Sequence, residues 1–414
     1  MPLPPATAYR PMLVRHANRV LPKLWDRRWL PPPDLSEATL DRQAIEATGL
    51  DDFGDGWFRE PLRVLLPALQ TEAQLNPMGR MIAHGSLLKT LKERLWAADL
   101  FARHPEIRAR PLKAPIVIVG AMRSGTTRLH RLLAGDERFA HLRLYEAMCP
   151  VPWPSSFARP RDPRIAYTAR GWKALNWINP AIAAVHPTGP LEPDEELGLL
   201  ENSLWGAQIE AQRRVPSYAR WCEAQDATPA YAHMADLLRL AGWFRGEDPA
   251  KPWVLKTPQH TQDLAALLRV WPDARLIFTH RDPVNVVGSA CSLAWHQMVV
   301  QSDDVDASWI GGEWLHKTGH RIDTCLRVRE TLSPDQQLDV SFEAMNRDWL
   351  GTMRRVYDFL GIDIAPAVAA MTSYVERARR EHPYATHRYD LADFGLDAAD
   401  VRARFAGYSA RFLA

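Results

Sequence analysis

The sequence of 414 residues lacks any apolar run of the length that crosses a bilayer as a helix, about 18 residues. Its first residues do not follow the charged, apolar and small-residue order of a secretory signal peptide. Cysteine is scarce: the four cysteines are far apart and form no Cys-x-x-Cys pair, which is typical of free thiols in a reducing compartment. We therefore expect a cytoplasmic protein.

The sequence also lacks an excess of charge of either sign. Lysine and arginine total 51 and aspartate and glutamate total 49, for a net charge of +2, which argues against a nucleic-acid-binding protein with a broad basic face. No His-Glu-x-x-His or comparable cluster of metal ligands is present, so we expect no bound metal. Hydrophobic residues make up 46%, enough for a sizeable core, and no feature indicates an oligomeric state.

Residues 1–110 are expected to form an N-terminal arm and a helical extension. Apolar residues recur at helical spacing in "REPLRVLLPALQ" and "SLLKTLKERLW", and "RARPLKAP" then breaks the pattern near residue 110. Before them, "RHANRVLPKLWDRRWL" combines basic residues with tryptophan and leucine, a composition that suits peripheral contact with the inner, anionic membrane surface. Because Pro22 interrupts this segment, an arm docked on the protein is at least as good an interpretation.

Residues 111–414 are expected to form an α/β domain. The apolar, β-branched run "APIVIVG" suits a strand that is buried on both faces of a parallel sheet. A later stretch repeats strand and helix, with strands expected over Trp253–Lys256 and Arg275–His280 and a helix from about Val284. This alternation predicts βαβ units around a central parallel sheet flanked by helices.

A glycine-rich loop, "VIVGAMRSGTT", follows the first of these strands. Gly120 and Gly125 keep the spacing of the G-x-x-x-x-G-K-[ST] nucleotide loop, but Thr126 replaces its lysine. A turn of this kind presents backbone N–H groups to an anion, and the N-terminus of the next helix adds partial positive charge. Because the lysine of an NTPase contacts the β- and γ-phosphates, its absence favours a ligand without a γ-phosphate. Arg123 supplies a cation inside the loop instead.

A second anion-binding pattern is "LIFTHRDPVNVVGSA". Arg281 ends an expected strand, and Asp282 and Pro283 are typical of the N-cap and first residue of a helix. Ser289 lies about two helical turns farther on. An arginine and a hydroxyl that converge in this way bind phosphate well. The Arg-Asp-Pro triplet is weak evidence alone, but it becomes specific when it is paired with the upstream loop.

Together, the two motifs resemble those of PAPS-dependent sulfotransferases, where PAPS is 3′-phosphoadenosine 5′-phosphosulfate. The similarity covers roughly residues 112–410, and "TGLDDFGD" and "LHRLLAGDERFAHLRLYEAMCPVP" are similar to the bacterial group that includes a mycobacterial menaquinone sulfotransferase. It implies the sulfotransferase fold and PAPS as the co-substrate. It assigns the 5′-phosphosulfate to Arg123, Ser124, Gly125, Thr126 and Thr127. The 3′-phosphate is then assigned to Arg281 and Ser289.

The sequence departs from the small-molecule cytosolic branch because it lacks the closing "RKGxxGDW" loop. The segment "HRYDLADFGL" is expected to take its place, with Arg388, His387 and Tyr389 as candidate nucleotide contacts.

Transfer of a sulfuryl group to an alcohol requires a base and cations that stabilise the developing charge. We expect Glu146 in "LRLYEAMCP" to be the base, because it follows an expected second strand and matches the glutamate base of the tyrosylprotein branch. His186 in "VHPTGP" is the rival base, with a pKa suited to the task. Lys256 resembles the family lysine that assists the leaving group, and Arg123 would stabilise charge on the sulfonate.

An acidic run of four residues suggests either a metal site or a stabilised helix start after Pro193, and the second is the better interpretation. Its members are Glu192, Asp194, Glu195 and Glu196.

We therefore expect an enzyme that transfers a sulfuryl group from PAPS, by in-line displacement, to a hydroxyl of an organic, apolar or lipid-like acceptor. Two alternatives remain open at this point. One is an ATP-dependent small-molecule kinase on a modified loop. The other is a non-catalytic nucleotide-binding or membrane-docking module. Residues 150–250 are expected to shape the acceptor pocket, and they contain no readable signature of the acceptor.

Overall fold

A four-stranded parallel sheet lies at the centre of the chain, in the strand order β2-β1-β3-β4. The computed structural model describes residues 9–179, 188–381 and 389–413. The strands are β1 (Ile116–Val119), β2 (Val254–Lys256), β3 (Arg275–His280) and β4 (Gln337–Ser341). The predicted central parallel sheet is confirmed, and β4 adds a strand that the sequence patterns did not indicate.

The central strand β1 is buried on both faces, as its apolar run predicts. Val117 and Val119 belong to one apolar core, which they share with the N-terminal helices. Ile116 and Ile118 belong to a second core on the opposite face of the sheet. This alternation follows from the two-residue period of a strand.

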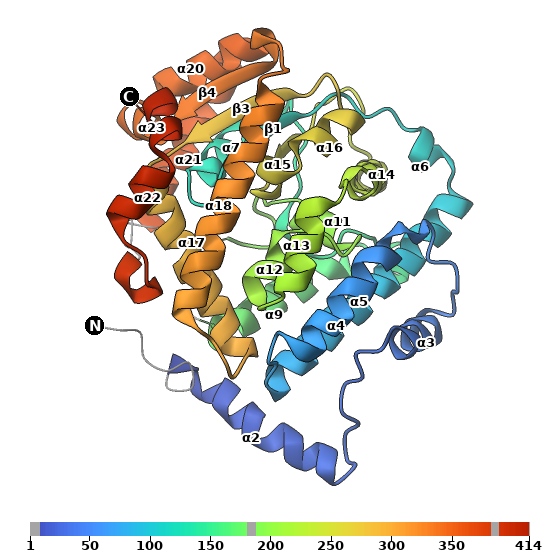
Figure 1. The fold of residues 1–414 in the computed structure, drawn as a ribbon. Helices are drawn as coiled ribbons and strands as arrows, with labels where there is room; N and C mark the ends of the chain where they lie inside the picture. The colour runs from blue at the N-terminus through green and yellow to red at the C-terminus, as the bar shows by residue number, and fades with distance from the viewer. Residues whose placement is uncertain (1–8, 180–187, 382–388, 414) are drawn as a thin grey trace.

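Helices surround the sheet (Figure 1). Those before β1 are α2 (Met12–Asp26), α3 (Glu37–Thr48), α4 (Arg59–Thr71), α5 (Pro77–Arg103) and α6 (Glu106–Ala109). Those between β1 and β2 are α7 (Thr126–Ala134), α8 (Leu144–Met148), α9 (Pro163–Ile178), α11 (Leu197–Glu201), α12 (Ala207–Gln212), α13 (Pro216–Ala224) and α14 (Thr228–Arg245).

Between β2 and β4 lie α15 (Gln259–Gln262), α16 (Leu264–Val270), α17 (Pro283–Gln301) and α18 (Ala307–Arg329). After β4 come α19 (Phe342–Arg347), α20 (Trp349–Leu360), α21 (Val368–Glu381), α22 (Ala398–Arg404) and α23 (Ala406–Phe412). Short 3₁₀ turns are η1 (Gly56–Phe58), η2 (Pro154–Ser156), η3 (Pro334–Gln336), η4 (Ala365–Ala367) and η5 (Leu391–Phe394).

The N-terminal helices share a core with the sheet. Leu62 of α4 and Leu91 of α5 are fully buried in the same apolar cluster as Leu255 of β2 and Leu276 of β3. In Figure 1 these helices lie at the end of the molecule opposite α20 and β4. One core therefore joins the two predicted parts, residues 1–110 and 111–414. Whether they are separate folding units stays a prediction.

Helix α2 corrects one expectation about the N-terminal arm. It runs unbroken through Pro22, from Met12 to Asp26, and packs against α5 and α9. A proline inside a helix removes one hydrogen bond, and contacts with neighbouring helices offset that loss. Within the described ranges, no helix combines the length and apolarity that a membrane span requires.

The strand expected before Glu146 is a second correction. The structure has only isolated bridges there, between Ala140 and Trp253 and between Arg143 and Pro193. Ala140 runs beside the residue that precedes β2, so this segment passes the amino end of that strand. Glu146 lies instead in the short helix α8.

Candidate active site

The glycine-rich loop connects β1 to α7 in a conformation suited to an anion. A Cβ on Gly120 would lie 2.0 Å from Thr279 Oγ1, so only glycine fits there. Gly125 has a φ of +88° and Arg123 a φ of 68°, both in the left-handed region. Left-handed residues in such a turn direct backbone N–H groups toward one point, and the first turn of α7 leaves its own N–H groups available.

The second motif lies directly beside this loop. Arg281 follows β3, and its Nη1 donates a hydrogen bond of 2.6 Å to the backbone oxygen of Arg123. The Nε of Arg123 in turn donates to Ser289 Oγ at 3.1 Å. Asp282 caps α17, which begins at Pro283, as its sequence predicted. The structure thus brings the residues of both motifs together.

Two buried or half-buried cations therefore lie close together at this point. The pKa of Arg123 is lowered, first by burial and then by the charge of Arg281. An anion bound between the two arginines would offset both the loss of solvation and the repulsion between them, because its negative charge interacts favourably with each cation. The arrangement fits a ligand phosphate.

Lys256 lies at the end of β2, beside the loop. Only 1% of its surface is exposed. Its Nζ forms an ion pair with the carboxylate of Glu195 and lies 3.4 Å from Thr127 Oγ1. A lysine and a carboxylate thus meet at the first turn of α7.

A chain of buried hydrogen bonds supports this pair. The backbone N–H of Lys256 donates to Glu196 Oε2 at 3.1 Å, and the other oxygen of Glu196 lies 2.5 Å from His260 Nε2. His260 Nδ1 is hydrogen-bonded to the hydroxyl of Tyr231 at 2.9 Å. His260 is fully buried, and these hydrogen bonds hold Glu196, the neighbour of Glu195, in place.

One large cavity, of about 1540 Å³, includes both the loop and the N-terminal helices in its lining. Its polar lining includes residues of the loop, Glu195 and Arg281, and Phe342 lies beside them. Much of its apolar lining comes from α4, α5 and α9, through Leu65, Leu69, Ile82, Leu87, Leu175 and Ile178. Ligand cavities are usually about 300–1,000 Å³, so this one has room for a nucleotide and a second organic molecule.

Glu146, the expected base, occupies a different environment. It is 2% exposed, and it is not among the described residues that line the large cavity. Its carboxylate accepts hydrogen bonds from the N–H of Arg143 (2.9 Å), the hydroxyl of Tyr145 (3.1 Å) and Arg245 Nη1 (3.0 Å). These contacts are those of a structural ion pair. The catalytic role of Glu146 stays a prediction, and the geometry favours Glu195.

Three predicted residues lie outside the described part of the chain. These are His186, the rival base, and His387 and Arg388, two of the candidate nucleotide contacts. Tyr389 is described: its hydroxyl donates to the backbone oxygen of Asn285 at 2.9 Å, on the first turn of α17. Its contact with a nucleotide also stays a prediction.

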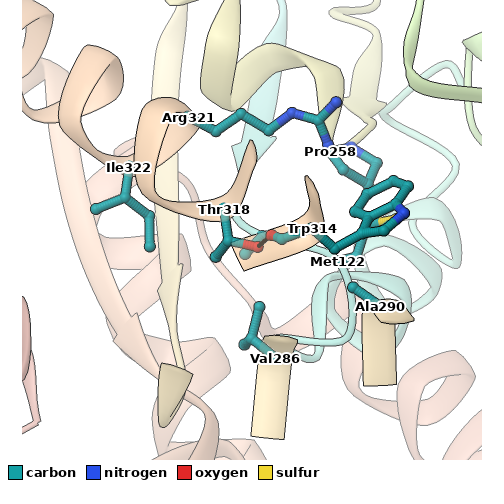
Figure 2. A pocket seen from close by; sticks show the side chains of 9 residues that line it. Met122, Pro258, Val286, Ala290, Trp314, Thr318, Arg321 and Ile322 are labelled. Carbon is teal, nitrogen blue, oxygen red and sulfur yellow. Dashed lines mark hydrogen bonds between the residues drawn. The ribbon is translucent and has the colours of Figure 1, made fainter. Parts of the chain in front are cut away.

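A small cavity of about 20 Å³ lies behind the loop and is shown in Figure 2. Met122 of the loop faces Val286 and Ala290 of α17 and Trp314 of α18 around it. The space is enough for about one water molecule and is too small for a substrate. Its function is therefore structural: α17 and α18 support the loop from behind.

A sequence model of the sulfotransferase family matches residues 115–366, which include both motifs and all four strands. The chain belongs to the sulfotransferase family. The crystal structure of sulfotransferase STF1 from Mycobacterium tuberculosis is 32% identical, with a TM-score of 0.79 over 91% of this chain and 100% of that one. Sulfotransferase STF9 from Mycobacterium avium is 25% identical, with a TM-score of 0.79 over 92% of this chain and 97% of that one.

A third sulfotransferase relative is named for its acceptor. It is the omega-hydroxy-beta-dihydromenaquinone-9 sulfotransferase Stf3 of Mycobacterium tuberculosis and Mycobacterium bovis. It is 27% identical over 319 residues, which are 72% of this chain and 74% of the relative.

The family decides the reaction class. This sulfotransferase is an enzyme that takes a sulfuryl group from a sulfate donor, and the kinase and the non-catalytic module are set aside. Within the described ranges, no group of three or more histidine, cysteine, aspartate or glutamate side chains is arranged to hold a metal ion.

Glu195 and Phe342 are the functional candidates that sequence reasoning missed. The acidic run around Glu195 was interpreted as a helix start, and Glu196 does precede α11. Phe342 packs against the loop, and the Arg281 guanidinium lies 4.1 Å from its ring centre. The only sequence signal was the position of Phe342 directly after a hydrophilic strand, which is too weak to indicate a site.

Proposed function

We propose that the protein transfers the sulfuryl group of PAPS to a hydroxyl of an apolar, lipid-like acceptor. The observation that carries this proposal is the single cavity whose lining includes both the phosphate loop and the apolar faces of α4, α5 and α9. A donor and a long apolar acceptor can therefore occupy one space and meet at the loop. The menaquinone-derived acceptor in the name of the relative Stf3 supports the same class.

The donor contacts follow from the two motifs. The loop from Arg123 to Thr127 would hold the 5′-phosphosulfate through backbone N–H groups and hydroxyls. Arg281 and Ser289 would hold the 3′-phosphate, and their hydrogen bonds to Arg123 support that assignment. Arg123 is then within reach of both ends of the donor.

Glu195 is the base that we propose for the acceptor hydroxyl. Its carboxylate would take the hydroxyl proton while the acceptor oxygen forms a bond to sulfur and the bond from sulfur to the bridging phosphate oxygen breaks. The electron pair of that bond stays on the phosphate oxygen, where Lys256 can donate a hydrogen bond. The ion pair between Lys256 and Glu195, and the proximity of Thr127, support this arrangement.

Two glutamine substitutions separate this base from the one first expected. With ³⁵S-labelled PAPS and a series of 1-alkanols, Glu195→Gln should lower kcat by about 100-fold or more, the usual contribution of a general base. Glu146→Gln should lower the melting temperature, since it leaves Arg245 partly unpaired, but should change kcat much less. A large loss of kcat in Glu146→Gln with full kcat in Glu195→Gln would restore Glu146 as the base.

Donor identity is tested by isothermal titration. Adenosine 3′,5′-bisphosphate should bind tightly without Mg²⁺, because no γ-phosphate lysine or metal is required. Preferential binding of Mg·ATP would contradict PAPS as the donor.

We also propose that α2 docks on anionic lipid at the cytoplasmic face of a membrane. Met12 at the start of α2 is 78% exposed, and Trp29, just after the end of α2, is 72% exposed. The basic residues along it are all exposed, namely Arg15, Arg19, Lys23, Arg27 and Arg28. An amphipathic segment with cations and exposed aromatic anchors binds such surfaces. The four cysteines, all free, are typical of a reducing compartment.

Vesicle sedimentation tests this docking. The wild type should bind vesicles that contain phosphatidylglycerol, less so at high salt, and should not bind pure phosphatidylcholine vesicles. Replacing Arg15, Arg19 and Lys23 together with glutamate should abolish binding, whereas Arg42→Glu on α3 should not. Equal binding by both variants would exclude α2 as the docking element.

A further inference from the structure

A second group of charged side chains lines the large cavity, apart from the donor loop. Lys89 belongs to α5, Glu201 ends α11 and Arg213 follows α12. The full length of α11 separates Glu201 from Glu195. The surrounding lining is largely apolar, including Leu204 and Ile209 nearby in the chain. Charged groups in such a lining require an explanation, because their burial is costly unless a partner is present.

Arg213 is the most unusual member of this group. Only 5% of its surface is exposed, and its Nε and Nη2 have no hydrogen-bond partner among the described residues. Burial lowers the pKa of this guanidinium to about 10, although the neighbouring Glu201 opposes the shift. Buried polar atoms are nearly always hydrogen-bonded, so two unpaired donors on a cavity wall point to a ligand atom.

The neighbouring groups almost balance the charge of Arg213. Lys89 Nζ lies 3.0 Å from Glu93 Oε2, so this lysine already has an anionic partner. Burial raises the pKa of Glu201 to about 7, and Lys89 and Arg213 oppose that shift. Glu93 and Glu201 lie beside the two cations. These carboxylates would repel an anionic ligand, whereas a neutral oxygen could accept hydrogen bonds from Arg213 without that repulsion. The balance therefore favours a neutral oxygen.

We propose that Arg213, Glu201 and Lys89 form a second polar subsite in the acceptor cavity, which binds a neutral oxygen of the acceptor. This oxygen, of a carbonyl or ester group, is distinct from the hydroxyl that receives the sulfuryl group, and an apolar spacer separates the two. The inference rests on the proposed function, since it assumes that the acceptor fills this cavity. It narrows the acceptor class from any lipid-like alcohol to an amphiphile with oxygen at both ends.

The test compares 1-alkanols with the methyl esters of ω-hydroxy fatty acids, over a matched series of chain lengths. Binding is followed by quenching of tryptophan fluorescence, because Trp172 lines the cavity, and sulfation is followed with labelled PAPS. At the best chain length, the ester should bind the wild type about 10-fold or more tightly than its matching alkanol, as one charge-assisted hydrogen bond allows.

Three variants test the subsite directly. Arg213→Met keeps the apolar stem and should bring the ester-to-alkanol ratio close to one. Arg213→Lys should restore part of the ratio, because lysine keeps the charge but not the planar fork. Arg42→Met, on the exposed surface of α3, should keep the full ratio. Thermal melts confirm that each variant is folded.

Each outcome decides the proposal. No ester preference at any chain length, or equal ratios in Arg213→Met and Arg42→Met, would overturn the subsite. Tighter binding of the free ω-hydroxy acid than of its ester would overturn the neutral-oxygen assignment. Ester binding that depends on Arg213 without any sulfation would uphold the subsite and count against the proposed hydroxyl acceptor. Equal binding and sulfation of alkanols and esters would support the proposed hydroxyl acceptor and count against the subsite.

Discussion

Glu195 and Lys256 meet across 61 positions of sequence, in a contact next to the phosphate loop. Lys256 is 1% exposed and the side chain of Glu195 is 14% exposed, so neither charge is well solvated. A buried pair of this kind depends on both partners, because the loss of one leaves the other uncompensated. If Lys256 contacts the donor as proposed, the donor phosphate would compete with Glu195 for the lysine.

Arg281→Ala should weaken donor binding. The arginine follows β3 directly and lies beside Arg123, so one charge-assisted hydrogen bond to the 3′-phosphate would be lost, about 1.5–3 kcal/mol. Titration with adenosine 3′,5′-bisphosphate measures the change, and Arg63→Ala on the exposed face of α4 is the control. An unchanged Kd would remove Arg281 from the donor site.

Glu201 should make stability depend on pH. Burial raises its pKa from 4.5 to about 7, so between these values the folded state binds the proton more tightly than the unfolded state. The free energy of unfolding therefore falls as pH rises through this window, by about 1–3 kcal/mol. Urea unfolding at several pH values should show the fall in the wild type and a smaller one in Glu201→Gln. Identical pH profiles would contradict the shift.

At the scale of elements, the β1–loop–α7 unit is fixed from three sides. β3 approaches Gly120 through Thr279, and α19 places Phe342 against Gly125. Helices α17 and α18 support Met122 around the small cavity of Figure 2. The loop geometry is therefore set before any donor binds, which reduces the entropy lost on binding.

Gly125→Ala should disrupt this element. An alanine at a φ of +88° is strained, and its Cβ would lie 2.7 Å from Phe342 Cδ2. We expect a loss of bisphosphate affinity of about tenfold or more, measured by titration. The matched control is Gly312→Ala inside α18, where no atom lies within 4 Å of the added Cβ. That change should stabilise the helix by about 0.5–1 kcal/mol, and equal affinities in the two variants would contradict the argument.

At the scale of the whole molecule, the N-terminal helices contribute to both the core and the cavity. Leu62 and Leu91 are buried with residues of β2 and β3, and Leu65 and Leu87 line the cavity. The cavity that we propose for the acceptor is therefore lined by the whole chain and is not confined to the part after residue 110.

Removal of residues 1–110 should therefore abolish cooperative unfolding, because it exposes the face of the core that contains Leu255 and Leu276. Removal of residues 1–33 alone should leave a cooperative transition at a lower temperature, since it removes the packing of α2 on α5 and α9 and the hydrogen bond of Arg10 to Val299 of α17, but no described residue of the sheet core. Thermal unfolding followed by circular dichroism distinguishes the two. A stable, cooperative fragment 111–414 would show that the predicted boundary is a true folding unit.

The sequence by itself determined the features that are local in the chain. The loop from Gly120 to Thr127 is contiguous with its strand and helix, so the strand–loop–helix unit was predictable, and its glycine positions and missing lysine already predicted an anion site there. Arg281 and Ser289 were predictable for a similar reason, because helical periodicity fixes their separation. The parallel sheet followed from apolar runs that alternate with helical segments.

Only the tertiary structure decided which carboxylate lies beside the loop and where the large cavity lies. Glu146 follows a segment that the sequence suggests is a strand, and Glu195 lies in an acidic run, whereas packing pairs the first with Arg245 and the second with Lys256. The cavity and the unpaired donors of Arg213 depend on helices that are brought together from distant parts of the chain. Which of these distant residues meet is set by how the helices pack, and no local pattern in the sequence indicates it.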